Sequence, residues 1–497
     1  MRKCLSVLKY VCQGFFSAIA ILGVIALPVA LAAQTPPATP EDMGLKPFGA
    51  YHGGNFDTVS MSNGNLFVKI PLFSIPQRGS VPLSYSLVYN TRHSKTYKSS
   101  CMKELTDQGT EDACTTQIRW AGSTPFVSGG ADAGTPGGVV LRQETIFGAA
   151  QGPFEARTWD ACYPFPVGPP GAPNMYCIAN SIGYTYRVFI DSTGASHMGG
   201  EIARGIWRSL DGSNFYYEES TGVSKNADGL FNNGTADASG CTYDPNGNCV
   251  ASTVDTLNRP IPNQVRAQTT ADCPSGPRQV AMEGTLDVPG LNSSNLHYIF
   301  CYVNVTVVDS VVFSTTADPV TTTDSSGYFL QSVKLPDSTA WQFEYYDTTG
   351  DLKKMTLPLG GSISYETTQT TIDEGDVRAT PGGASSVLSR TLDANDGSAP
   401  SVTHYSYAPG GNSMDTTVTD AAGNDTLTHL DCFVGGPTCS LYPTSVSSYS
   451  GSGSSRSLLR TVTTEYQYTP ALVSQGGDVF AAYPTSVTTT LDNGLVS

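Results

Sequence analysis

Apolar and polar side chains alternate along the second half of the chain in a pattern that predicts β-strands. In the clearest segment, Trp341, Phe343 and Tyr345 are separated by single polar residues. A period of two places the three rings on one face of a strand. A polar turn follows, and Met355 and Leu357 then begin a second apolar run. We therefore expect these residues to form an antiparallel β-hairpin.

Similar alternation recurs elsewhere, and Asn63-Gly64 between two alternating runs predicts a hairpin turn. Longer polar stretches at 91–180 and 221–295 predict loop-rich insertions. The expected fold class is all-β, with antiparallel hairpins and meanders forming an extended curved sheet that carries disulfide-stapled loop insertions. The expected regions are a signal peptide (1–33), a Pro-rich linker (34–50), an N-terminal β-region with cysteine-rich insertions (51–320) and a β-hairpin array (321–497).

The turn of the clearest hairpin has the sequence Tyr346-Asp347-Thr348-Thr349-Gly350-Asp351-Leu352. Asp at the first position and Gly at the fourth suit a type I turn, because the carboxylate caps turn amides and Gly accepts a positive φ. A second copy preceded by tyrosine is Tyr243-Asp244-Pro245-Asn246-Gly247. Asp-x-x-Gly also occurs at Asp191/Gly194, Asp324/Gly327 and Asp420/Gly423. We expect each copy to join two short strands.

These features resemble the YD-repeat (RHS-repeat) family, which is named after the Tyr-Asp-x-x-Gly motif. The match covers Leu335 to Leu352 and Leu357 to Tyr365. A second set of motifs resembles the leading segment of secreted family members: Asp57-Thr58-Val59, Asn63-Gly64-Asn65-Leu66, Ile70-Pro71-Leu72, Arg78-Gly79 and Leu87-x-Tyr89-Asn90. The resemblance implies a β-sheet shell that encloses a C-terminal or partner domain. This chain shows few clean repeats, so it resembles the N-terminal portion of such proteins.

The N-terminus has the features of an export signal. Basic residues precede an apolar run over 14–33, and Ala30-Leu31-Ala32 forms a small-x-small cleavage site. The run is long for a signal peptide, so an uncleaved membrane anchor is the alternative. No later segment is apolar enough to span a membrane. The formal net charge of −16 and the lack of basic clusters argue against nucleic-acid binding.

Ten of the twelve cysteines lie beyond the signal, and an even number in an exported chain suggests disulfides. Sequence alone does not fix their pairing. We favour bonds between near neighbours because short loops close at small entropic cost. A metal cluster is the alternative, although no pair has Cys-x-x-Cys spacing. The favoured pairs are Cys101/Cys114, Cys162/Cys177, Cys241/Cys249, Cys273/Cys301 and Cys432/Cys439.

The sequence contains no recognisable catalytic motif, and we predict no catalytic residue, cofactor or metal. The six histidines lack zinc-motif spacing. Two acidic loops that begin at Asp244 and Asp393 resemble fragments of calcium sites, but type I turns use the same residues. Paired carboxylates of a secreted hydrolase are a further alternative, although no pair is distinguished by the sequence.

Two functional hypotheses remain. The first is a secreted or cell-surface scaffold whose partners are further YD repeats or an enclosed effector domain. The second is a carbohydrate-binding or adhesive module that binds cell-surface glycans through an aromatic stripe. The stripe comprises Trp341, Phe343, Tyr345, Tyr365, Tyr405, Tyr407, Tyr466 and Tyr468. Such alternating aromatics more often form the packed face of a sheet.

Overall fold

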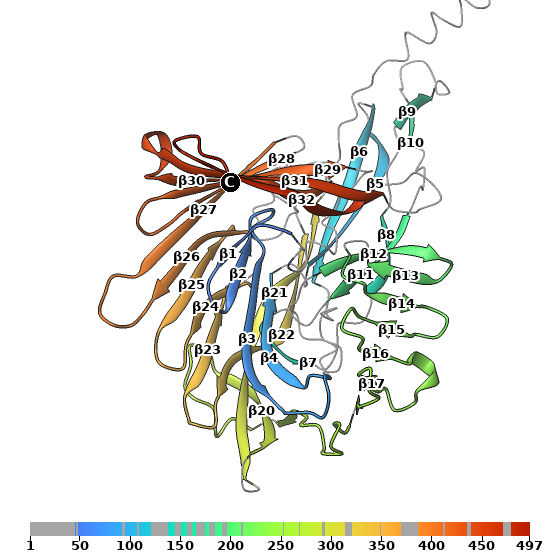
Figure 1. The fold of residues 1–497 in the computed structure, drawn as a ribbon, viewed down its shortest axis with the longest axis vertical. Coiled ribbons are helices and arrows are strands. Elements are labelled where there is room, and N and C mark those ends of the chain that lie inside the picture. The colour runs from blue at the N-terminus through green and yellow to red at the C-terminus, as the bar shows by residue number, and fades with distance from the viewer. Residues whose placement is uncertain are drawn as a thin grey trace, which may run out of the picture. The chain divides into compact units, whose positions relative to one another are not determined.

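The computed structural model describes most of the compact unit Pro36–Ser497 and is built almost entirely of β-strands (Figure 1). Its described residues are 45, 48–91, 95–106, 109–120, 138–144, 151–156, 162–165, 174–177, 184–190, 196–209, 212–251, 253–267, 269–290, 294–313, 321–347, 349–368, 386–410, 413–434, 439–470 and 479–497. The expected signal peptide lies outside these residues. Within them the only helical segments are two 3₁₀ turns, η2 (Gly234–Ala236) and η5 (Gly453–Ser455). The predicted all-β class is confirmed.

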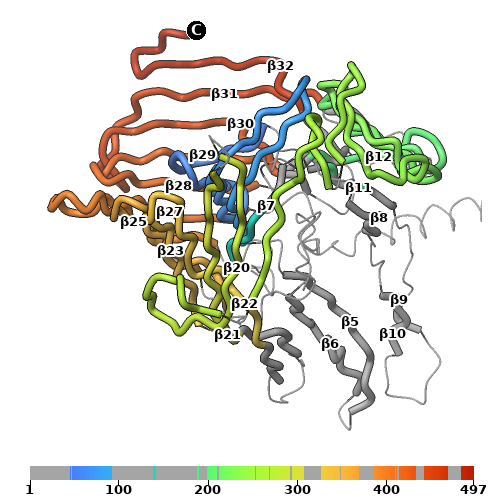
Figure 2. Tube along the Cα trace, turned by 90° about the horizontal axis from the view of Figure 1, so that it is seen from below, coloured from blue at the N-terminus to red at the C-terminus, as the bar shows by residue number. Residues whose placement is uncertain are grey.

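The largest sheet has 16 strands, and 14 of them follow one another in chain order, each antiparallel to the next (Figures 1 and 2). These 14 strands are β19 (Val265–Ala267), β20 (Val280–Pro289), β21 (Asn295–Phe313), β22 (Thr321–Lys334), β23 (Ala340–Tyr345), β24 (Leu352–Thr356), β25 (Ser362–Thr367), β26 (Val387–Asp393), β27 (Ser401–Pro409), β28 (Ser413–Thr419), β29 (Asp425–Val434), β30 (Cys439–Ser450), β31 (Ser457–Pro470) and β32 (Val479–Leu491). We call them the strand array. The expected region boundary at residue 320 falls between β21 and β22, which are paired neighbours.

Two more strands extend this sheet from the side. The hairpin of β5 (Lys95–Thr106) and β6 (Gly109–Trp120) joins it through pairing of β6 with β21.

A second sheet of five strands is built mainly from residues 51–90. Its order is β1 (Tyr51–Gly53), β2 (Asp57–Ser60), β3 (Leu66–Ser74), β4 (Ser84–Asn90) and β7 (Val140–Glu144). We call it the N-terminal sheet. As predicted, a turn at Asn63-Gly64 joins two of its strands, and Gly64 adopts a φ of +68° there. Val59, Val68 and Leu87 are fully buried, so this sheet contributes apolar side chains to the core.

A third sheet has nine strands, and five of them fall in the regions 91–180 and 221–295 that were expected to be loop-rich. Most of its strands are short, because turns recur every few residues. The strands are β8 (Gln151–Ala156), β11 (Tyr184–Ile190), β12 (Ser196–Ala203), β13 (Ile206–Ser209), β14 (Tyr216–Glu218), β15 (Ser224–Lys225), β16 (Phe231–Asn232), β17 (Thr242–Tyr243) and β18 (Cys249–Val250). A separate pair comprises β9 (Cys162–Phe165) and β10 (Asn174–Cys177).

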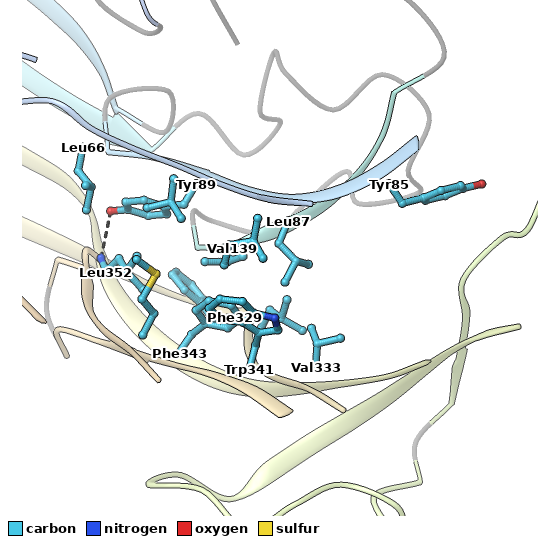
Figure 3. Packing of buried hydrophobic residues seen from close by; sticks show 14 of the residues in the cluster. Leu66, Tyr85, Leu87, Tyr89, Val139, Phe329, Val333, Trp341, Phe343 and Leu352 are labelled. Atoms are coloured by element: carbon cyan, nitrogen blue, oxygen red, sulfur yellow. Dashed lines mark hydrogen bonds between the residues drawn. The ribbon is translucent and has the colours of Figure 1, made fainter. Parts of the chain in front are cut away.

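The buried hydrophobic side chains of the three sheets form one cluster. One part of it lies where β3 and β4 face β22–β24 (Figure 3). There Leu66 and Leu87 of the N-terminal sheet and Phe329 and Phe343 of the array point into the space between the two sheets, all at most 1% exposed. Full burial of each such side chain contributes about 1.5–3 kcal/mol. The N-terminal sheet and the array therefore share a core.

Candidate functional site: the repeat turns and the junction with the N-terminal sheet

The Asp-x-x-Gly turns at Asp244 and Asp420 have the same geometry. In the Asp244 turn, Oδ1 accepts the amides of Asn246 and Asn248 at 2.9 Å each, and the Gly247 amide donates to the Asp244 carbonyl at 3.0 Å. Gly247 has a φ of +79°, a backbone conformation that glycine adopts without strain. The Asn248 side chain, by donating to the carboxylate, lowers the pKa of Asp244. This turn therefore forms as predicted, with the carboxylate as its cap.

The Asp420 turn repeats these bonds. Its Oδ1 accepts the amides of Ala422 and Asn424 at 2.9 and 2.8 Å, and Gly423 donates to the Asp420 carbonyl at 2.9 Å. The Asn424 amide is the main cause that lowers the pKa of Asp420.

A third turn of this type begins at Asp255, where the Asp-x-x-Gly pattern predicts none. Asn258 stands in the glycine place with a φ of +59°, and its amide donates to the Asp255 carbonyl at 2.9 Å. Asp255 Oδ1 accepts the amides of Leu257 and Arg259 at 2.9 Å each. Asparagine tolerates this conformation better than most residues, so Asp-x-x-Asn was the available signal.

The turn at Tyr346 differs from the prediction by one position. The Gly350 amide donates to the carbonyl of Tyr346, not Asp347, at 3.1 Å, and Gly350 has a φ of +67°. The Asp347 carboxylate is 89% exposed and pairs with Arg278. The Tyr346 hydroxyl donates to the Tyr365 carbonyl at 2.9 Å and so connects the turn to β25.

Of the two other expected turns, one is contradicted by the structure and the other lies outside the described residues. Asp324 and Gly327 lie inside β22, opposite Val308 and Val305 of β21, so the prediction of a turn there is wrong. Pairing with the long strand β21 outweighs the local turn preference of Asp-Ser-Ser-Gly. Asp191 and Gly194 lie outside the described residues.

A buried ion pair joins the N-terminal sheet to the array. Asp57 on β2 is fully buried, and the Arg390 guanidinium on β26 donates to both of its oxygens. The Tyr365 hydroxyl and the Gly54 amide also donate to this carboxylate, at 2.9 and 3.1 Å. Burial and the neighbouring Asp57 raise the pKa of Tyr365 well above its usual value. The phenol therefore stays neutral and acts as a donor.

His52 lies at the edge of the same junction. Its Nδ1 is 2.8 Å from the Tyr405 hydroxyl on β27. Burial, reinforced by the Arg390 guanidinium, lowers the pKa of His52, while Asp57 and Asp420 oppose the shift. The imidazole is therefore held in its neutral form.

The Asn63-Gly64 turn also lies against the array. The Gly64 carbonyl accepts the Val387 amide at 3.0 Å, and the Asn63 carbonyl accepts the Ser386 hydroxyl at 2.8 Å. A methyl group on Gly64 would lie 2.4 Å from the Ser386 side chain. One element of the leading-segment motif thus contacts strands more than 300 positions later in the chain.

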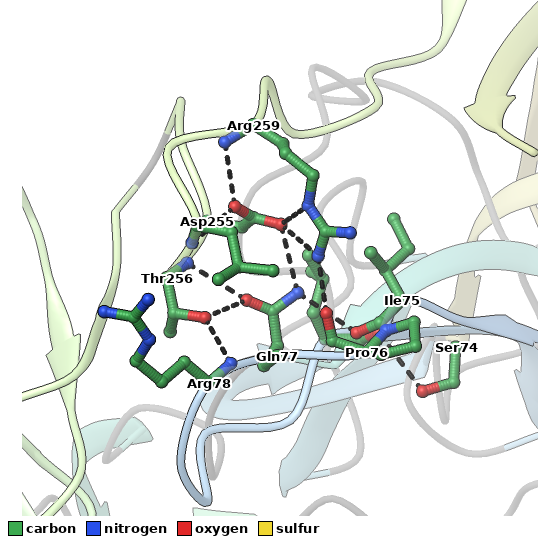
Figure 4. Close-up of polar contacts among 10 residues, drawn as sticks. Ser74, Ile75, Pro76, Gln77, Arg78, Asp255, Thr256 and Arg259 are labelled. Atoms are coloured by element: carbon green, nitrogen blue, oxygen red, sulfur yellow. Dashed lines mark hydrogen bonds and ion pairs between the residues drawn. The ribbon is translucent and has the colours of Figure 1, made fainter. Parts of the chain in front are cut away.

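Another part of the leading segment, the loop 75–83, is held by two of the Asp turns. The Ser80 amide donates to Asp244 Oδ2 at 3.0 Å, and a methyl group on Gly79 would lie 2.0 Å from that oxygen. Figure 4 shows Gln77 between the carboxylate of Asp255, to which it donates at 3.2 Å, and Thr256, whose amide donates to it at 3.0 Å. The turn carboxylates therefore cap their own turns and also bind this loop.

Most of the aromatic stripe is buried. Trp341, Phe343, Tyr345, Tyr365 and Tyr405 are at most 7% exposed. The Trp341 ring packs edge-on against Phe56 with 5.2 Å between centroids, and the Tyr345 hydroxyl donates to the Leu330 carbonyl at 2.7 Å. The Tyr89 hydroxyl accepts the Leu352 amide at 3.0 Å across the core (Figure 3). These rings form the packed face of the sheet. The side chain of Tyr468 lies outside the described residues.

Two of the expected disulfides are present, Cys241–Cys249 and Cys273–Cys301. The backbone register places Cys101 opposite Cys114 and Cys162 opposite Cys177, which suits a cross-strand bond. Cys432 instead lies opposite Leu441, and Cys439 opposite Val434. The side chains of these six cysteines lie outside the described part of the chain.

In the two acidic loops, the carboxylates of Asp244 and Asp393 accept hydrogen bonds from backbone amides of their own turns. Asp393 Oδ1 accepts the Asn395 amide at 2.8 Å, as Asp244 does in its turn. Among the described residues, no group of three His, Cys, Asp or Glu side chains is placed to hold a metal ion. No helix in the described ranges has the length and apolar character to cross a bilayer.

Neither the scan of protein-family models nor the search of curated proteins found a match to this chain. The geometry of the turns and the junction therefore provides the basis for assigning a function.

Proposed function

We propose that the chain is an exported structural scaffold that carries or encloses a partner segment, in the manner of the YD-repeat proteins it resembles. The main support is the strand array itself, in which 14 consecutive strands pair in chain order. Turn carboxylates and glycines close hairpins, and Asp57 fixes the N-terminal sheet on the array through Arg390 and Tyr365. This use of acidic and aromatic side chains suits a framework that performs no catalysis.

Export is supported by the two disulfides together with the signal-like N-terminus. Disulfides persist in oxidising compartments and are rare in the cytosol. Cleavage after the Ala30-Leu31-Ala32 motif would release a chain that begins near residue 33. N-terminal sequencing of the protein recovered outside the cell tests this proposal. A retained residue 1–33 segment would favour the membrane-anchored alternative.

The scaffold role is tested at the encoding locus. We expect more Tyr-Asp-x-x-Gly turns and a variable segment, encoded downstream in the same frame or in a neighbouring gene. That variable segment should resist protease only when it is co-expressed with this chain. A locus without such a segment, or a segment digested equally fast in both cases, would contradict the proposal.

The carbohydrate alternative has a separate test. Because five stripe rings are buried, we expect purified residues 34–497 to bind no sugar on a glycan array. Binding that disappears in a folded Trp341→Ala variant would favour the carbohydrate-binding module instead.

A further inference from the structure

The pentapeptide Tyr-Pro-Thr-Ser-Val occurs twice, at 442–446 in β30 and at 483–487 in β32. Both copies interrupt the hydrogen-bonded ladder with the preceding strand by one extra residue. Pro443 lies opposite Leu430 and Ser445 opposite His429, so Thr444 is an extra residue. Pro484 lies opposite Tyr466 and Ser486 opposite Glu465, which leaves Thr485 extra. The two strands are therefore equivalent units of one repeat, including the β-bulge.

The first copy is covered by the strand that follows it. Tyr466 on β31 packs against Tyr442 with 5.4 Å between ring centroids, and its hydroxyl donates to the Pro443 carbonyl at 3.0 Å. Tyr442 is consequently only 4% exposed. Burial raises the pKa of Tyr466 to about 12, so its hydroxyl stays protonated.

The second copy lies on β32, the last strand of the array. In the described part of the chain, no ring or hydroxyl covers Tyr483 and Pro484 as Tyr466 covers the first copy. Tyr483 is only partly buried, and Val487 is 60% exposed. β12 approaches β32 but forms no ladder with it. The outer edge of β32 therefore has unpaired backbone groups in these ranges.

The final residues of the chain already begin to pair with this edge. The Leu491 amide donates to the Leu495 carbonyl at 2.9 Å, and Gly494 has a φ of +79°, as in the Asp turns. Thr489 then exchanges two hydrogen bonds with Ser497, at 2.8 and 2.9 Å. In an antiparallel ladder, the backbone N–H and C=O groups of every second residue point toward the same edge. The backbone groups of Val487 therefore point toward the free edge, as those of Thr489 do.

We propose that the edge of β32 binds an antiparallel β-strand that carries tyrosine at the place equivalent to Tyr466. The bound strand would continue the register started by Ser497 opposite Thr489. Its tyrosine would cover Tyr483 and donate to the Pro484 carbonyl. Main-chain hydrogen bonds would provide affinity and the tyrosine would provide specificity, as in other cases of strand addition. This inference rests on strand register and does not depend on export or on the scaffold role.

The experiment uses the full chain and a synthetic peptide with the sequence of residues 461–470, which includes Tyr466. We expect saturable binding by isothermal titration calorimetry, and protection of β32 amides in hydrogen exchange. The backbone amides of Val462 and Thr464 point toward β30 in the native ladder. A peptide N-methylated at these two positions should therefore bind about tenfold more weakly, because it loses hydrogen bonds to the edge of β32. A matched peptide methylated at Thr461 and Thr463 should keep its affinity.

A peptide with Tyr466→Ala should also bind several-fold more weakly, with less protection around Tyr483. The proposal would be overturned by absent binding, by equal affinity of the two methylated peptides, or by a chain dimer that buries β32 in solution. The locus and protease tests of the scaffold role are independent of all three outcomes.

Discussion

At the scale of single residues, the carboxylate of Asp57 is the most connected polar group of the junction. It accepts hydrogen bonds from Arg390, Tyr365 and Gly54, and its side chain is fully buried. A buried charge with this many donors is stable only while its partners remain in place. The junction therefore depends on a group whose partners come from two distant parts of the sequence.

Replacing either member of this pair should destabilise the whole unit. We expect Asp57→Asn and Arg390→Met each to lower the free energy of unfolding by about 3–5 kcal/mol, because each leaves the other member unpaired. Urea denaturation monitored by tryptophan fluorescence measures this effect. The exposed pair of Asp347 and Arg278 provides the control, and Asp347→Asn should change stability by less than about 1 kcal/mol. Equal effects at both pairs would contradict the assigned role of Asp57.

His52 and His429 should affect the pH dependence of stability in opposite directions, because the pKa of His52 is lowered and that of His429 is raised. Burial lowers the pKa of His52, so the unfolded chain binds its proton more readily. The stability that His52 provides is complete above about pH 6.5, the unfolded value, and is lost as pH falls toward the folded pKa. We therefore expect His52→Gln to reduce the loss of stability between pH 7 and pH 5, as measured by urea titrations at each pH.

His429 is the matched comparison. Its hydrogen bond to Asp415 raises the pKa of His429, so its contribution is present below the unfolded pKa and is lost as pH rises through the folded one. His429→Gln should change the slope in the opposite direction from His52→Gln. Changes of the same sign in both variants would show that these assignments are wrong.

At the scale of elements, the Asp turns act both as hairpin closures and as contacts between sheets. The turn at Asp244 joins β17 to β18 and also binds the loop 75–83 through Ser80. The backbone of Gly79 lies directly against this turn. A side chain at position 79 would therefore clash with the Asp244 carboxylate.

A pair of glycine variants separates backbone strain from this close contact. Gly79 and Gly247 have nearly equal φ angles of +80° and +79°, but only Gly79 has neighbours within 4 Å of an added methyl group. We expect Gly247→Ala to cost about 1 kcal/mol from conformation alone. Gly79→Ala should cost at least about 2 kcal/mol more because the turn and loop must separate. Equal losses in denaturation would contradict the observed packing.

Local patterns predicted the elements well, and the failures have identifiable causes. The strand predicted at Trp341–Tyr345 and the turn predicted at Asn63-Gly64 are both present. Each is determined by a pattern that spans only a few neighbouring residues. Asp324 was misassigned because its tetrapeptide has turn composition, whereas pairing with β21 decides its conformation. Asp255 was missed because asparagine replaces the turn glycine.

The junction could not be predicted from spacing. Asp57 and Arg390 are separated by 333 positions, and neither residue lies in a local pattern that points to the other. The repeated Tyr-Pro-Thr-Ser-Val unit was visible in the sequence, but only the strand register shows that both copies carry the same bulge.

Across the whole molecule, we expect the leading segment and the strand array to unfold as one cooperative unit, because they share a core and the Asp57 junction. The proposed scaffold role requires this cooperativity, because a leading segment that opened independently would leave the buried face of β22–β28 exposed.

Hydrogen exchange measured by mass spectrometry on the wild type and on Arg390→Met tests this claim most directly. We predict that the amides of β2–β4 and β22–β28 exchange at similarly slow rates in the wild type, and that the substitution accelerates both groups together. Fast exchange of β2–β4 while β22–β28 stays protected, unchanged by the substitution, would show that the two parts open independently.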